Sequence, residues 1–133
     1  MMQQLLLLFA MFLLSTDVDA TEKINSIYYN IDINGIYYDL DCDTQTAIVD
    51  RPALPRKSVI VIPTTIVFNN VEFHVTEIER KAFEGCHYIT SITIGGNVNT
   101  IGDEAFAGCS GLTSVTIPSN VTSIGKGIFK KCI

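Results

Sequence analysis

Apolar and polar residues in the last third of the chain follow a pattern that returns after 23 residues. Two segments align at this offset without gaps, ITSITIGGNVNTIGDEAFAGCSG at 89–111 and LTSVTIPSNVTSIGKGIFKKCI at 112–133. The second half of an earlier unit, VTEIERKAFEGC, precedes them by the same offset. Self-similarity at periods of about 20 to 50 residues is typical of repeat architectures. The pattern therefore predicts a stack of similar units.

Each unit is expected to begin with a short strand. In TSVTIP, residues 113–118, the apolar Val115 and Ile117 occupy alternate positions, so their side chains share one face. Pro118 has no N–H and ends the pairing. The apolar residues that follow are irregularly spaced, which favours a coil that turns back and directs one apolar side chain inward at each bend. A single unit of this kind cannot bury its apolar face, whereas stacked units bury a continuous core and align their strands in one parallel sheet.

Apolar residues at matched positions of the two later units are expected to form the core of this solenoid. They are Ile92, Ile94, Ile101, Phe106, Cys109, Val115, Ile117, Ile124, Phe129 and Cys132.

The string L-x-x-V-x-I-P-x-x-V-x-x-I-G-x-x-x-F-x-x-C, at 112–132, resembles the BspA-like leucine-rich repeat of bacterial and protist surface antigens. The resemblance is close over residues 75–133. It implies a mainly β fold, a leucine-rich repeat solenoid with a parallel sheet on its concave side, coil or short helical turns opposite, and an N-terminal β-hairpin cap. It also implies an adhesin that contacts host matrix, host cells or other microbes.

The start of the chain is unlike the rest. Ten consecutive apolar residues, Leu5–Leu14, precede a short polar stretch that ends at Ala20. Ten helical residues span about half of a bilayer core, so residues 1–20 are predicted to be a signal peptide. We therefore expect a secreted or cell-surface protein. Residues 21–55 are expected to form the cap that the resemblance implies.

Residues 56–88 are predicted to be a degenerate first repeat with an inserted hairpin. The spacing from Ile62 to Ile94 is nine residues longer than the period. The extra residues are expected to turn at Asn69 and Asn70, because Asn tolerates positive φ. The units 89–111 and 112–133 follow.

The last unit ends in pattern at FKKCI, without a polar cap. A solenoid without such a cap exposes its apolar edge. We expect this unit to be truncated, as the piece of a longer surface protein. End-to-end self-association of a short protein is the alternative.

Composition narrows the candidate chemistry. The chain has 14 acidic and 9 basic residues and no basic patch, which argues against nucleic acid as a partner. No segment after the first twenty residues has the roughly 18 apolar residues of a membrane span. Structural zinc sites use close pairs of cysteines, whereas the closest spacing here is 23 residues. We therefore expect no metal and no cofactor.

The repeat cysteines are better explained as core residues than as reactive groups. Equivalent residues of a parallel stack lie about 4.8 Å apart, within the Cα range of a disulfide, yet their side chains point the same way. Buried free thiols are favoured, and oxidation of one neighbouring pair stays open. His87 follows Cys86 and suggests a catalytic dyad, but the matched positions are Ser110 and Ile133. This variation favours an exposed surface position.

An acidic segment, DLDCDTQTAIVD, matches part of the spacing of a calcium-binding loop. Its carboxylates occupy positions 1, 3, 5 and 12 of such a loop and are Asp39, Asp41, Asp43 and Asp50. Thr44 stands where the loop requires Gly, and the flanks are strand-like. We expect a solvated hairpin turn.

Hydroxyl side chains are expected to cover the outer face of the repeat strands, which is the common binding face of solenoids. They are Ser91, Thr93, Ser114 and Thr116. This face has none of the Tyr, Trp or Arg residues that dominate binding hot spots. The tyrosines of the predicted cap, Tyr28, Tyr29, Tyr37 and Tyr38, are expected to pack over the first repeat.

The prediction for function is a secreted or cell-surface module that mediates protein–protein or host-cell adhesion without catalysis. Its partner would be a protein of a host matrix, a host cell or a microbial surface. The alternative is a structural cap or spacer of a larger surface antigen, with no ligand of its own.

Overall fold

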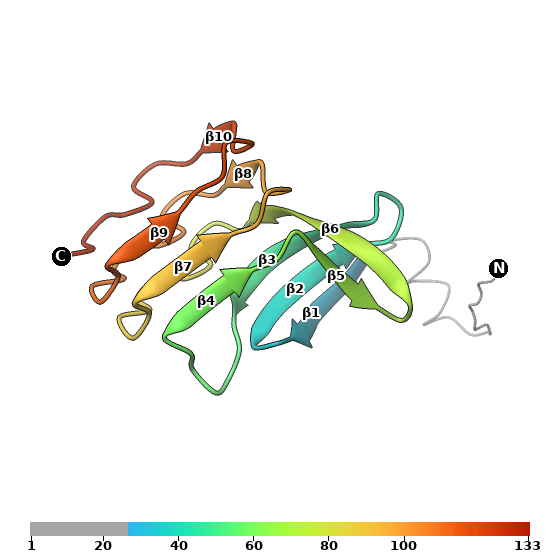
Figure 1. Cartoon of the computed structure of the whole chain (residues 1–133), viewed down its shortest axis with the longest axis horizontal. Coiled ribbons are helices and arrows are strands. Elements are labelled where there is room, and N and C mark those ends of the chain that lie inside the picture. Colours follow the sequence, from blue (N-terminus) through green and yellow to red (C-terminus); the bar gives the residue numbers. More distant parts are fainter. Residues whose placement is uncertain (1–26) are drawn as a thin grey trace.

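The computed structural model describes residues 27–133, which form strands and turns (Figure 1). The predicted signal peptide, 1–20, and residues 21–26 of the predicted cap lie outside the described residues. Within 27–133, no helix is long and apolar enough to cross a membrane.

Ten strands make up the described part of the chain. They are β1 (Ile27–Ile33), β2 (Ile36–Asp41), β3 (Thr46–Pro52), β4 (Val59–Ile62), β5 (Thr65–Phe68), β6 (Val71–Ile78), β7 (Ser91–Ile94), β8 (Thr100–Ile101), β9 (Ser114–Thr116) and β10 (Ser123–Ile124). One sheet has the order β1-β2-β3-β6-β8-β10, with β5 paired to β6, and the other has the order β4-β7-β9.

The cap is a three-stranded meander, one strand more than the β-hairpin that the resemblance implies. Strands β1, β2 and β3 pair antiparallel, and β3 then pairs parallel to β6. Tyr38 is buried, and the Tyr28 ring packs edge-on against Phe68 with centroids 5.6 Å apart. Tyr29 departs from the expected packing, because its side chain is exposed. The meander thus covers one end of the stack and extends its larger sheet.

The inserted hairpin of the first repeat lies between β5 and β6. These strands pair antiparallel, with Phe68 opposite Val71. Asn69 and Asn70 have φ values of 52° and 65°. This is the left-handed conformation that the sequence predicts for this Asn pair.

The repeat units stack in register as the period predicts. Ser91 pairs with Ser114 and Ile92 with Val115 across β7 and β9, one period apart. On the opposite side of the stack, coil or short helical turns are expected, but the structure has short strands there. β8 and β10 are two-residue strands that continue parallel from β6. This happens because stacking in register places every extended dipeptide of one unit beside its equivalent in the next.

Close approach of neighbouring units explains two glycines of the repeat. A Cβ on Gly102 would lie 2.5 Å from the main-chain nitrogen of Arg80. A Cβ on Gly125, one period later, would lie 2.4 Å from the nitrogen of Asp103. These distances are too short for any side chain, so the stack requires Gly here.

The core lies between the two sheets and is itself periodic. The rings of Phe83, Phe106 and Phe129 stack, with successive centroids 5.7 and 5.9 Å apart. The Cys109 thiol donates to the Phe83 carbonyl at 3.1 Å, and the Cys132 thiol donates to the Phe106 carbonyl at 2.9 Å. Each unit therefore contacts the preceding one through a ring and a thiol.

The expected core is buried in the first of the two units but not throughout the second. Five residues are buried: Ile92, Ile94, Ile101, Phe106 and Cys109. Val115, Ile117 and Cys132 are half-buried. The prediction is wrong for Ile124 and Phe129, which are 53% and 40% exposed, because no described element packs over the last unit.

Replacing Phe106 by Ala should lower the free energy of unfolding by about 3–5 kcal/mol, because Phe106 is fully buried between two stacked rings. The matched Phe129→Ala change removes a ring that is stacked on one side only and should cost about 1 kcal/mol. Urea unfolding monitored by circular dichroism measures both values. Equal losses would contradict a core centred on Phe106.

The exposed apolar edge of the last unit also predicts self-association. Association would bury Ile124 and Phe129, so the unfolding midpoint should rise with protein concentration. Replacing both residues by Ser should remove this dependence. A monomeric unfolding transition that is independent of concentration in the unsubstituted chain would refute the prediction.

Candidate functional site

The face of the β4-β7-β9 sheet carries the binding residues expected from sequence. Ser91 and Ser114 lie side by side on it, as do Thr93 and Thr116. Thr93, Ser114 and Thr116 are exposed and Ser91 is half-buried. The structure therefore assembles the four hydroxyls into two short rows.

Two valines extend these rows and were missed by sequence reasoning. Val59 pairs with Ser91 and Val61 pairs with Thr93, so both side chains lie on the same face as the hydroxyls. They are 55% and 60% exposed. The available signal was the uninterrupted apolar run VIVI of β4, where the other units alternate apolar and hydroxyl residues. This face is thus apolar at one edge and hydroxyl-rich beyond it, and we call it the valine–hydroxyl face.

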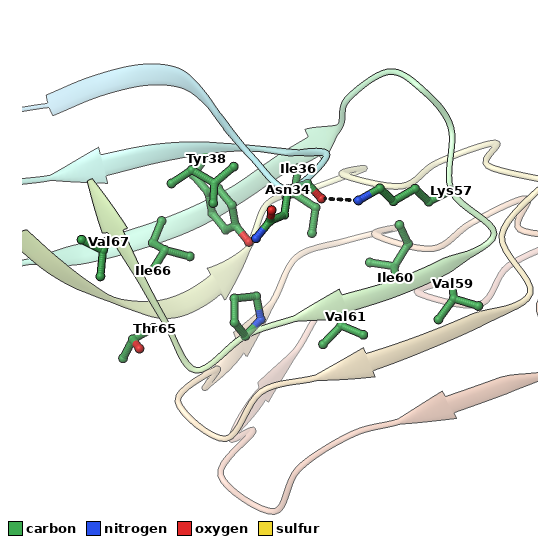
Figure 2. A pocket seen from close by; sticks show the side chains of 12 residues that line it. Asn34, Ile36, Tyr38, Lys57, Val59, Ile60, Val61, Thr65, Ile66 and Val67 are labelled. Atoms are coloured by element: carbon green, nitrogen blue, oxygen red, sulfur yellow. Dashed lines mark hydrogen bonds between the residues drawn. The ribbon is translucent and has the colours of Figure 1, made fainter. Parts of the chain in front are cut away.

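A groove of about 450 Å³ adjoins the valine edge. Figure 2 shows Asn34, Ile36 and Tyr38 of the cap on one side of it and Val59 and Val61 of β4 on the other. The groove arises because β4 belongs to one sheet and the cap strands to the other. Its volume lies in the range of small-ligand sites, about 300–1,000 Å³.

Lys57 is the one charged residue among the described residues that line the groove. Its ammonium donates to the Asn34 carbonyl at 2.9 Å (Figure 2). Its aliphatic stem lies against Gly35. A lysine ammonium has three donors, so two remain for a ligand. The adjacent Arg56 stacks over the Tyr88 ring, 5.2 Å from its centroid. This end of the groove is therefore basic in an acidic protein.

The surroundings of the buried thiols suit a structural role. All four cysteines are free, with Cys86 and Cys109 buried and Cys42 exposed. Burial raises the pKa of Cys109 to about 12 and also raises the pKa of Cys86. The Cys86 sulfur accepts a hydrogen bond from the Tyr88 hydroxyl at 3.5 Å, while the exposed His87 ring packs edge-on against Tyr88. The Tyr88 hydrogen bond lowers the pKa of Cys86, but burial outweighs it, so both buried thiols are protonated, the opposite of what a nucleophile needs.

The acidic segment forms a turn between β2 and β3. A side-chain oxygen of Asp41 accepts the N–H groups of Asp43 and Thr44 at 2.9 and 3.3 Å. Asp50 forms an ion pair with Arg51 instead of converging on this turn. In the described part of the chain, no group of three His, Cys, Asp or Glu side chains is placed to hold a metal ion.

Together, the periodic register, the stacked phenylalanines and the parallel β4-β7-β9 sheet define a leucine-rich repeat solenoid. The family model described as BspA type leucine-rich repeat region matches residues 64–133. The chain belongs to this family. The search of curated proteins found no match.

Three solved structures show the same relationship. A leucine-rich repeat protein from Bacteroides ovatus is 31% identical, with a TM-score of 0.71, over 78% of this chain and 27% of that one. One from Bacteroides capillosus is 30% identical, with a TM-score of 0.67, over 76% and 72%. A leucine rich cell surface protein from Faecalibacterium prausnitzii is 28% identical, with a TM-score of 0.66, over 80% and 28%. The chain thus spans about a quarter of the B. ovatus protein.

Thiol labelling of the folded chain should distinguish the cysteines. Exposed Cys42 should react first, although local desolvation and then the carboxylates of Asp41 and Asp43 raise its pKa. Cys109 should react at least roughly 100-fold more slowly than Cys42, because Cys109 is buried and its pKa is about 12. Mass spectrometry after timed alkylation measures the order, with Cys42→Ser as the control that removes the fast phase. Rapid labelling of Cys86 or Cys109 in the folded chain would support a reactive thiol instead.

Proposed function

We propose that this chain is a protein-binding module of a secreted or cell-surface protein, and that it mediates adhesion without catalysis. The partner is a protein of a host matrix, a host cell or a microbial surface. One observation carries this proposal: the valine–hydroxyl face exposes Val59 and Val61 beside two rows of hydroxyls.

The exposure of these valines supports binding because it is a departure from the repeat. At the paired positions the other units have Ser and Thr, whose hydroxyl groups are well hydrated when they are exposed. An exposed apolar patch rimmed by polar residues is typical of protein interaction sites. The adjoining groove is lined mainly by apolar residues, with a few polar ones that include Lys57, which suits a protein partner.

The absence of catalysis is part of the proposal. It is supported by the burial of Cys86 and Cys109, which raises the pKa of both thiols. Localisation at the surface or outside the cell is supported by the apolar segment Leu5–Leu14 and by the description of one similar protein as a cell surface protein.

The test is an adhesion assay with the full chain on immobilised extracellular-matrix preparations, host cells and microbial cells. Replacing Val59 by Ser and Val61 by Thr restores the residue types of the other units. This double variant should bind about tenfold more weakly, a loss of ~1.4 kcal/mol. The matched control Val71→Thr makes the same chemical change on an exposed valine outside the face and should bind normally.

Two results would contradict the proposal. A folded chain that adheres to none of these surfaces would favour the spacer that has no ligand of its own. Retention of the chain inside a secretion-competent expression host would contradict a secreted or surface protein.

A further inference from the structure

The outer edge of β4 has main-chain groups with no strand beside them. β4 is an outer strand of its sheet and pairs with β7. The Ser91 N–H donates to the Ser58 carbonyl at 3.3 Å, so the main-chain groups of Ser58 face β7. Because the N–H and C=O groups of successive residues point to opposite edges of a strand, those of Val59 and Val61 face away from β7. Among the described residues, no other strand satisfies them.

This free edge lies along the groove described above. The groove separates β4 from the β1–β2 turn, and both valines line it together with Tyr38 and Lys57 (Figure 2). A ligand in the groove therefore meets main-chain donors and acceptors at β4 and apolar side chains opposite. A free strand edge of this kind is a template for another strand.

We propose that the groove binds an extended segment of the partner protein, which adds to the edge of β4 as a further strand of the β4-β7-β9 sheet. This inference deepens the proposed function and rests on it. The N–H and C=O groups of Val59 and Val61 pair with the segment, which is the strand-addition mode of peptide recognition. The segment would extend the sheet by one strand at a spacing of about 4.8 Å.

The surroundings of the edge define the chemistry of the segment. Neighbouring strands place paired side chains on the same face, so the residue beside Ile60 points toward Ile36 and Tyr38 and is apolar. Residues beside Val59 and Val61 lie on the outer face, where β-branched side chains pack best. A carboxylate at the end near Lys57 complements the one charge of the groove lining.

The same charge argues against the outer strands of this sheet, β4 and β9, of a second copy as the occupant. The segment around β4, residues 56–65, contains no Asp or Glu, and neither does the segment around β9, residues 111–120. Pairing either edge with β4 would therefore leave Lys57 without a carboxylate from the partner copy.

The test uses the full chain, labelled with ¹⁵N, and the peptide acetyl-Glu-Val-Thr-Val-Thr-Val-Glu-amide, which has a carboxylate at both ends and fits either strand direction. At saturating peptide, amide hydrogen exchange at Val59 and Val61 should slow at least tenfold. Exchange at Ile60 and Ile62 should stay unchanged, because their N–H groups already face β7.

Two matched probes separate main-chain pairing from other contacts. The same peptide N-methylated at its five central amides keeps the side chains but cannot pair as a strand, and it should give no protection. Replacing both glutamates of the peptide by glutamine, or using Lys57→Gln, should weaken binding by up to about fivefold, the scale of an exposed ion pair.

The outcomes distinguish this inference from the proposed function. Protection of Val59 and Val61 by the first peptide and not by the N-methylated one supports strand addition. Equal effects of the two peptides overturn it, and so does protection of the valines in the chain without peptide, whether by a second copy or by its own N-terminal segment. If the Val59→Ser/Val61→Thr variant loses adhesion while the peptide gives no protection, the proposed function stands and strand addition fails. If the chain neither adheres nor binds the peptide, both fail.

Discussion

Every feature of this fold depends on holding neighbouring 23-residue units in one register. The register is maintained by main-chain bonds between equivalent residues, such as the Thr113 N–H to the Thr90 carbonyl at 2.9 Å. Side chains repeat the contact, because the Thr113 hydroxyl donates to the same carbonyl at 3.1 Å. A shift by one residue would exchange the buried and exposed faces of each strand and expose the core. The stack therefore has one register in which the rings, thiols and hydroxyls all meet their equivalents.

The cysteines illustrate how the register gives a reactive residue type a structural role. In two successive units the thiol is directed at the carbonyl of the phenylalanine one unit earlier. Burial raises the pKa of Cys109, and the neighbouring Cys86 and Cys132 raise it further. Each protonated thiol adds a second donor to a carbonyl that already accepts a main-chain N–H, and it does so at little cost in volume.

The candidate site exists because the first unit differs from those that follow. Its strand β4 carries Val59 and Val61 where the later strands carry hydroxyls. Its inserted β5–β6 hairpin and the cap meander belong to the other sheet, which leaves β4 as an outer strand beside a groove. Irregularity at the capped end of an otherwise periodic stack thus concentrates exposed apolar side chains, free main-chain groups and the Lys57 charge in one place.

The period, the parallel strands, the buried thiols of Cys86 and Cys109 and the turn at Asn69-Asn70 could all be predicted from sequence. These features depend on local alternation and on comparison of one unit with the next, and both are visible in the chain itself. An exposed apolar edge on the last unit could also be predicted, but that its exposed side chains include Ile124 and Phe129 could not, because burial depends on which elements lie above a residue. Neither could the groove or the free edge of β4, since they depend on which strands do not pair. Repetition determines contacts between equivalent residues, whereas the partition of strands into two sheets is settled only when the whole chain packs.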